Sequence, residues 1–185
     1  MDAWGDGYAA VGLPGYFFNG FYGESEIMNS STFIIKLNAD YGYGSEWSQA
    51  RYIPEEVFDN IREENFPDYL QYEIGSEYDM KLDSEGNIHI VMQIFPKQDD
   101  NYGYVCDENG HDNGAGWYHF TIEFDNLMWN DDPESWNWEH SKVVTGAYTW
   151  CFYNPDGESY INDSQAQLAF DRDDSDLVYI VADLG

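Results

Sequence analysis

The sequence has very little positive charge. Lys and Arg account for 7 of the 185 residues, against 36 Asp and Glu, which gives a formal net charge of −29 at pH 7. A surface so poor in cations repels phosphate groups, which argues against direct binding of nucleic acid or of an anionic membrane. The chain also lacks the Gly-rich loop, followed by Lys and Ser or Thr, that holds nucleotide phosphates. Kinase and nucleotide-hydrolysing activities are therefore disfavoured.

Cysteine and long apolar runs are scarce as well. Cys106 and Cys151 are the two cysteines, and we expect reduced thiols because a chain that can bury a normal core does not need a disulfide. No segment approaches the roughly 18 consecutive apolar residues of a membrane span. Residues 1–6 lack the basic and apolar regions of a secretion signal. The sequence therefore predicts a cytoplasmic protein without a membrane partner.

Aromatic residues, in contrast, are abundant. The chain contains 16 Tyr, 11 Phe and 7 Trp, whereas disordered acidic chains are poor in such residues. Its length suits one domain with a real core, and no linker, internal repeat or low-complexity tract interrupts it. We therefore predict a single acidic, β-rich domain over residues 1–185.

One segment has the pattern of a helix, near residues 54–65. Pro54 suits the first helical turn, and Glu55 and Glu56 favour the positive end of the helix dipole. Apolar residues recur at helical spacing up to Pro67, which ends the segment. An acidic rod about three turns long is expected on the outer side. Its carboxylates are Glu56, Asp59, Glu63 and Glu64.

The rest of the pattern favours strands and tight turns. Apolar residues alternate along 88–95, so we expect one face of this strand to be buried and the other to be partly buried. Together with 77–82 it flanks a turn that contains Gly86, which predicts a β-hairpin. Further strands are expected at 15–22, 32–38, 117–124, 143–153, 165–170 and 177–182. The expected fold class is α+β and β-rich: a mainly antiparallel sheet of about nine or ten strands, as a sandwich or a strongly bent sheet, with one main helix.

The negative charge is unevenly distributed. Eleven Asp and Glu and no Lys or Arg lie between Lys97 and Lys142, and eight more carboxylates follow against Arg172 alone. Ordinary protein surfaces intersperse both signs of charge. Adaptation to high salt explains this poorly, because the chain has only three Arg. We therefore interpret the carboxylates as a functional surface.

The amount of charge matches a stretch of nucleic acid. Duplex DNA carries one negative charge per about 1.7 Å of axis, so the net charge of −29 corresponds to roughly 50 Å of duplex, or about 15 base pairs. In function such a protein is similar to the DNA-mimic class, which includes anti-restriction and anti-CRISPR proteins of phages and mobile elements. The resemblance implies a non-enzymatic inhibitor whose carboxylates occupy the nucleic-acid-binding site of a basic protein, in the host cytoplasm if the chain is phage-encoded.

No catalytic or metal-binding arrangement stands out. Glu73, Glu77 and Glu123 lie in or beside predicted strands, but no pair of carboxylates shows the separate roles that a glycosidase needs. A nucleophile elbow is absent, and the acidic loops lack the glycine and terminal glutamate of an EF-hand. The candidate zinc ligands are Cys106, His111, His119 and His140. Their spacing matches no known zinc-binding pattern. We expect no catalytic residue, no metal and no cofactor.

Tryptophans accompany the acidic residues of the second half. Trp136 and Trp138 lie in a polar loop, so we expect them to be exposed and to anchor a partner beside carboxylates that fit a basic groove. The predicted partner-binding residues are Glu63, Glu64, Asp99, Asp100, Asp107, Glu108, Asp131, Asp132, Glu134, Trp136, Trp138 and Glu139.

Other functions remain open at the level of sequence. An immunity protein that neutralises one basic nuclease toxin has the same surface, but its binding should be partner-specific and less sensitive to salt. A carbohydrate-binding or glycoside-cleaving β domain predicts an aromatic-lined cleft, and a structural or virion component predicts self-assembly. The oligomeric state stays open too, a homodimer included.

Overall fold

The computed structural model of this protein describes residues 2–4, 8–18, 27–39, 47–97, 116–145, 151–153, 159–161, 166–171 and 178–182. These residues form mainly antiparallel strands with one main helix, which confirms the α+β, β-rich fold class. The helical segments are α1 (Glu55–Asn65), α2 (Phe124–Trp129) and the 3-10 turn η1 (Pro133–Ser135). The strands are β1 (Asp2–Trp4), β2 (Tyr8–Phe18), β3 (Ile27–Ala39), β4 (Arg51–Tyr52), β5 (Gln71–Leu82), β6 (Asn87–Lys97), β7 (Gly116–Glu123), β8 (Glu139–Thr145), β9 (Cys151–Tyr153), β10 (Ser159–Ile161), β11 (Ala166–Phe170) and β12 (Val178–Ala182).

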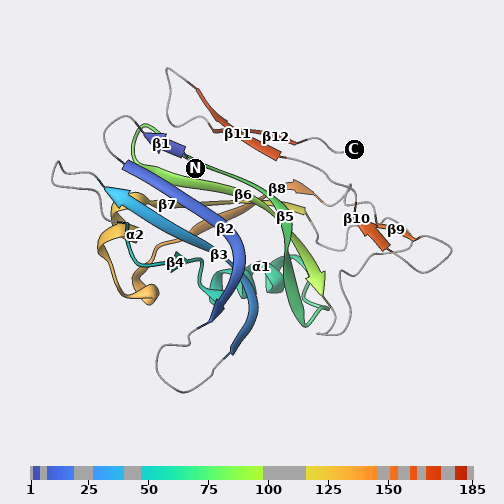
Figure 1. Ribbon diagram of the computed structural model, residues 1–185. Coiled ribbons are helices and arrows are strands. Elements are labelled where there is room, and N and C mark those ends of the chain that lie inside the picture. Colours follow the sequence, from blue (N-terminus) through green and yellow to red (C-terminus); the bar gives the residue numbers. More distant parts are fainter. Residues whose placement is uncertain are drawn as a thin grey trace.

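The strands form two four-stranded antiparallel sheets with simple connections, and the pairs β9–β10 and β11–β12 form two-stranded antiparallel sheets (Figure 1). Sheet A has the order β1-β2-β3-β4 and sheet B the order β5-β6-β7-β8, so neighbours in the chain are neighbours in space. Sheet A contacts sheet B along β5, and the hairpin β11–β12 contacts β5 and β6. No helix in the described part of the chain combines the length and the hydropathy needed to cross a bilayer.

The central strand β6 is buried on both faces. The residues that face the main core are all fully buried: Ile88, Ile90, Met92 and Ile94. On the other face Val91 packs with Trp117 in a second cluster, which β11 covers. The alternating pattern predicted the first face correctly. It underestimated burial of the second face, because sequence alone does not show that the β11–β12 hairpin returns to it.

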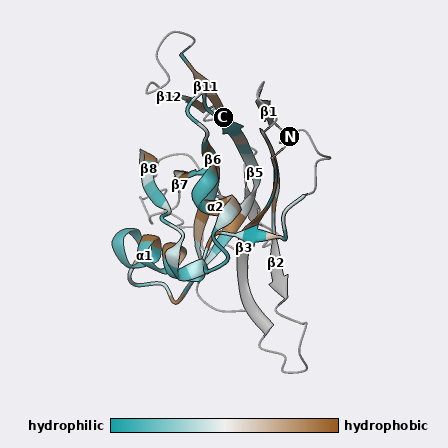
Figure 2. Ribbon diagram, turned by 90° about the vertical axis from the view of Figure 1, so that its left-hand side faces the viewer, coloured by the Kyte–Doolittle hydropathy of each residue, from teal (hydrophilic) through white to brown (hydrophobic). Residues whose placement is uncertain are grey.

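Helix α1 closes the first face of sheet B. The ring of Phe58 stacks on Tyr72 with 4.8 Å between centroids and lies 5.7 Å from Phe120. Ile61 is fully buried beside it, and burying each of these side chains stabilises the fold by about 1.5 to 3 kcal/mol. Because one stripe of α1 is apolar, its other side turns outward and is hydrophilic (Figure 2). The helix and the β11–β12 hairpin lie on opposite sides of sheet B (Figure 1).

The predicted hairpin connects β5 and β6. Gly86 has φ of 88°, a left-handed conformation that glycine adopts without strain. Asp83 closes the turn, because its Oδ1 accepts hydrogen bonds from the backbone N–H groups of Glu85 and Asn87 at 2.9 and 2.8 Å. The turn therefore holds a carboxylate at one end of sheet B.

Candidate functional site

Two segments distant in sequence form one acidic surface, which we call the acidic face. It consists of residues 51–68, which include α1, and residues 125–135, which include η1. The segments contain ten carboxylates against two arginines. These carboxylates are Glu55, Glu56, Asp59, Glu63, Glu64, Asp68, Asp125, Asp131, Asp132 and Glu134.

Helix α1 supplies a high density of negative charge. Burial of Phe58 and Ile61 turns its acidic residues outward, and the side chain of Glu63 is 68% exposed. The 11 residues of α1 span about 16 Å and carry five carboxylates, or one per about 3.3 Å. A single strand of B-DNA carries one phosphate per about 3.4 Å. The predicted site residues Glu63 and Glu64 therefore lie on a helix whose average charge per unit length is close to that of a DNA strand.

Both arginines of the acidic face are occupied within the protein. Arg62 offsets part of the charge of α1, with its guanidinium 3.4 Å from Asp59 Oδ1 and 3.3 Å from Glu63 Oε1. Arg51 donates from Nη2 to Asp131 Oδ1 at 2.7 Å. No described cation pairs with Glu55, Glu56, Glu64 or Glu134. The surface therefore keeps a surplus of free carboxylates.

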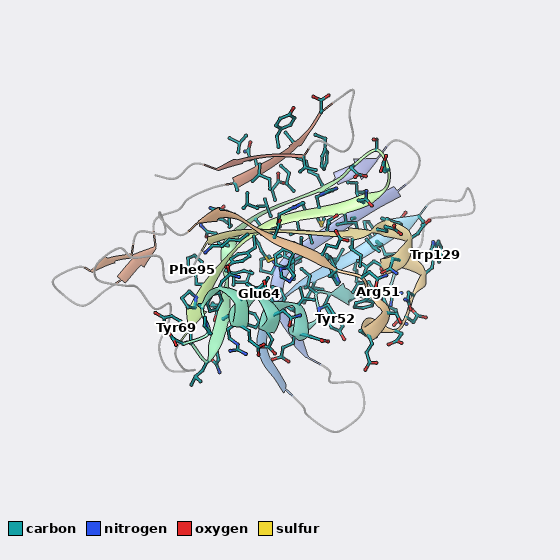
Figure 3. All side chains as sticks on the ribbon, turned by 180° about the vertical axis from the view of Figure 1, so that it is seen from behind. Arg51, Tyr52, Glu64, Tyr69, Phe95 and Trp129 are labelled. Atoms are coloured by element: carbon teal, nitrogen blue, oxygen red, sulfur yellow. The ribbon has the colours of Figure 1, made fainter. Side chains whose placement is uncertain are left out.

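Arg51 joins the two halves of the acidic face. It lies in β4, just before α1, and its side chain is only 8% exposed. Besides Asp131 it reaches the carbonyl oxygen of Met128 at 3.1 Å and lies over the ring of Trp136, 5.6 Å from the centroid. In Figure 3 Arg51 and Tyr52 lie between Glu64 on α1 and Trp129. The segment 125–135 is thus held against the start of α1.

The expectation that Trp136 is exposed was wrong. Its side chain is buried at 7% exposure, and its ring packs edge-on against Tyr52 at 5.3 Å. The indole Nε1 donates to the carbonyl oxygen of Asn130 at 2.8 Å. Trp138 is half-buried and packs against the main core. The polar neighbours of Trp136 and Trp138 suggested exposure. The two indoles instead point toward the protein and pack the loop against the core.

The exposed tryptophan of this region is Trp129, which was not among the predicted partner-binding residues. It is 57% exposed at the end of α2. The signal lies in the helical spacing of α2: Phe124 and Leu127 are buried, so Asp125 and Trp129 fall on the outer side. The sequence offered this pattern, but a helix this short is hard to distinguish from the end of strand β7.

Glu139 is separated from the rest of the predicted site. In sheet B it pairs with Thr121, which pairs with His89, on the face opposite α1. There it lines a cavity of about 600 Å³ at the end of the sheet. The described residues that line this cavity are Asp83, Asn87, His89, Thr121, Ile122, Glu123, Asn126, Asn137, Glu139 and Val178.

A buried hydrogen-bonded chain ends at this cavity. Asp83 Oδ2 lies 3.1 Å from His89 Nε2, and His89 Nδ1 lies 2.9 Å from His119 Nε2. An ionised Asp83 only accepts, so with both imidazoles neutral His89 donates to Asp83 and accepts from His119. The edge of Phe170 packs on the His89 ring.

The electrostatics of this chain favour one protonation state. Burial alone would raise the pKa of Asp83, but hydrogen bonds from Asn87, His89 and the Glu85 backbone outweigh it and lower that pKa below its usual value. Burial and the neighbouring His89 lower the pKa of His119 to about 4. At neutral pH, Asp83 is ionised and His119 is neutral.

The cavity combines polar side chains with apolar surface that includes Ile122 and Val178. Its described lining contains no Trp, Tyr or Phe side chain on which a sugar ring could stack, and its imidazole, that of His89, is buried. Within the described residues, no group of three or more His, Cys, Asp or Glu is placed to hold a metal ion. Asp83 is accounted for by its role in closing the hairpin, and His89 and His119 continue its hydrogen bonds across β6 and β7.

Several predicted residues cannot be placed. Asp99, Asp100, Asp107 and Glu108 lie outside the described residues, as do Cys106 and His111. Asp131, Asp132 and Glu134 are exposed on the acidic face together with Glu63 and Glu64. The structure therefore brings together five of the predicted carboxylates and separates Glu139 from them.

Comparison with known proteins supplies no relative. The chain matches no family model, no curated protein and no solved structure.

Proposed function

We propose that this protein is a non-enzymatic inhibitor that mimics nucleic acid. Its acidic face occupies the nucleic-acid-binding site of a basic protein, as anti-restriction and anti-CRISPR inhibitors do, and it competes with DNA or RNA for that site. The observation that carries the proposal is the surplus of outward carboxylates on one face, where both arginines are already paired within the chain.

The mechanism follows from the charge and its arrangement. A net charge of −29 attracts a basic groove over long range and speeds encounter. At short range, carboxylates of α1 meet Lys and Arg side chains with an average charge per unit length close to that of phosphates along a strand. The contacts of Arg51 with Asp131, Met128 and Trp136 hold the segment 125–135 in place. Binding therefore requires little ordering of this segment.

The same acidic surface would also suit an immunity protein that neutralises a basic toxin. The two functions differ in what displaces the bound partner. A mimic should be displaced by DNA and by salt, because both compete for the same cations. An immunity protein recognises one partner through shape, so added DNA should leave the complex intact. The cavity beside Glu139 gives less support to a carbohydrate-binding or glycoside-cleaving function, because its described lining contains no Trp, Tyr or Phe side chain.

The experiment that tests the proposal is capture with competition. Purified protein is immobilised and offered a panel of purified basic DNA- and RNA-binding proteins at about 0.1 M salt, where the Debye length is about 10 Å. We expect at least one of them to bind and to be released both by duplex DNA and by about 0.5 M salt. Retention that is indifferent to DNA would favour the immunity function, and binding of none would overturn the proposal.

A pair of matched variants separates the acidic face from net charge alone. Replacing Glu55, Glu63 and Glu134 by Gln removes three carboxylates from the face. Replacing Glu73, Glu77 and Glu85 by Gln removes the same charge from β5 and the hairpin that follows it. We expect the first variant to lose roughly 5- to 30-fold in affinity, which corresponds to about 0.3 to 0.7 kcal/mol for each lost ion pair, and the second variant to lose less than threefold. Equal losses would mean that only net charge matters.

A further inference from the structure

Trp129 is held in an exposed position on the acidic face. It ends α2, whose inner side buries Phe124 and Leu127. Its indole Nε1 donates to Asp125 Oδ1, one helical turn earlier, at 3.2 Å. This bond fixes the ring on the outer side of the helix while 57% of the residue stays accessible. Large apolar surface is left in water here although burying it would stabilise the fold.

The backbone on both sides of Trp129 is tied to buried side chains. The carbonyl oxygen of Met128 accepts from Arg51 Nη2 at 3.1 Å. The carbonyl oxygen of Asn130 accepts from Trp136 Nε1 at 2.8 Å. Because Arg51 and Trp136 are both buried, these bonds hold the backbone on both sides of the indole in place. Trp129 is therefore a pre-organised contact, of the kind that contributes most at protein interfaces.

The surroundings of Trp129 select the chemistry of its partner. Asp125 bonds to the indole, and Asp131 and Asp132 follow in the adjacent loop. The one described cation beneath this segment, Arg51, is paired with Asp131. An indole face among carboxylates suits a guanidinium, which stacks on aromatic rings and is held by carboxylates at its edge. An ammonium group is more strongly hydrated and stacks less well.

We infer that Trp129 is the anchor of the acidic face and that it stacks on an arginine side chain of the basic partner. This inference rests on the proposed function and adds the residue and the side chain that supply short-range specificity. Carboxylates attract any basic surface, whereas a fixed indole distinguishes arginine from lysine.

The test compares two peptides of equal charge. Binding of nona-arginine and nona-lysine to the purified protein is measured by calorimetry at about 0.15 M salt, and the ratio of the two affinities cancels the general electrostatic attraction. The variant is Trp129→Leu, which keeps an apolar side chain and removes the aromatic face. The matched control is Tyr179→Leu, an aromatic residue that is 49% exposed on β12, away from the acidic face.

We expect the wild-type protein and Tyr179→Leu to prefer nona-arginine by about 3- to 10-fold, and Trp129→Leu to lose most of that preference. A preference that survives in Trp129→Leu, or that is lost equally in both variants, would overturn the inference, as would a wild-type protein that does not distinguish the peptides. Because the probes are defined, the outcome is independent of DNA competition. A Trp129-dependent preference without any partner that DNA displaces would reject the proposed function alone.

Discussion

The carboxylates of the acidic face and the carboxylate of Asp83 are chemically alike but occupy opposite environments. Asp131 is 89% exposed and has one described ion partner, whereas Asp83 is 3% exposed and accepts four hydrogen bonds, from Glu85, Asn87 and His89. The exposed carboxylates repel one another, which lowers the stability of the fold, and their surface ion pairs add little stability in return. The buried group closes a hairpin. The presence of a carboxylate therefore says little about whether it serves binding or stability. The number of hydrogen bonds that it accepts within the protein says more.

The largest effect should come from removing the buried carboxylate. Asp83→Ala leaves three donors of the turn and His89 without an acceptor, so we expect the free energy of unfolding to fall by about 2 to 4 kcal/mol. Urea titration is the measurement, because guanidinium would screen the surface charge. Asp68→Ala removes an exposed acid just after α1 and should change stability by less than about 0.5 kcal/mol. Similar losses of stability in Asp83→Ala and Asp68→Ala would contradict the distinction between buried and exposed carboxylates.

The Arg51–Asp131 pair lies between these two extremes, since one partner is buried and the other exposed. Asp131→Ala should cost about 1 to 2 kcal/mol, because water replaces the carboxylate only in part. In an Arg51→Met background the same change should cost almost nothing. The double-mutant cycle measures the coupling. Asp59→Ala is the control: it breaks the longer, 3.4 Å pair with Arg62, which also pairs with Glu63, and its expected cost is below about 0.5 kcal/mol.

The smallest effect concerns the pH dependence of His119. Its pKa is about 4 in the folded protein, against 6.5 for an ordinary histidine such as that of the unfolded chain, so between these values the unfolded chain binds the extra proton. Stability should therefore fall as pH drops from 6.5 towards 4, by about 1 kcal/mol after allowance for solvent screening.

The His119 effect is measured as a difference between proteins. His119→Gln should remove this part of the pH dependence, while His140→Gln, on the other face of sheet B, controls for the loss of an imidazole. Protonation of surface carboxylates changes stability over the same range in every variant, so it cancels in the comparison. An identical pH profile for wild type and His119→Gln would contradict the assignment.

Much of the fold was predictable because its signals are local. The helix around Phe58, the hairpin with Gly86 and the alternation of β6 each depend on residues close in sequence, and all three are confirmed. The candidate site was predictable only in part. Glu63 and Glu134 are exposed as expected, but the exposed tryptophan is Trp129, not Trp136 or Trp138, because burial in a loop depends on what the rest of the chain places beneath it.

By itself, the sequence determined the amount of charge, the scarcity of cations and the β-rich class, since composition and short-range periodicity suffice for these properties. Tertiary structure decided which carboxylates share a face. Arg51 reaches 80 residues along the chain to Asp131, and the pleat of β8 turns Glu139 to the opposite side of sheet B. Both outcomes depend on strand register and on contacts distant in sequence, and no local pattern of residues encodes them.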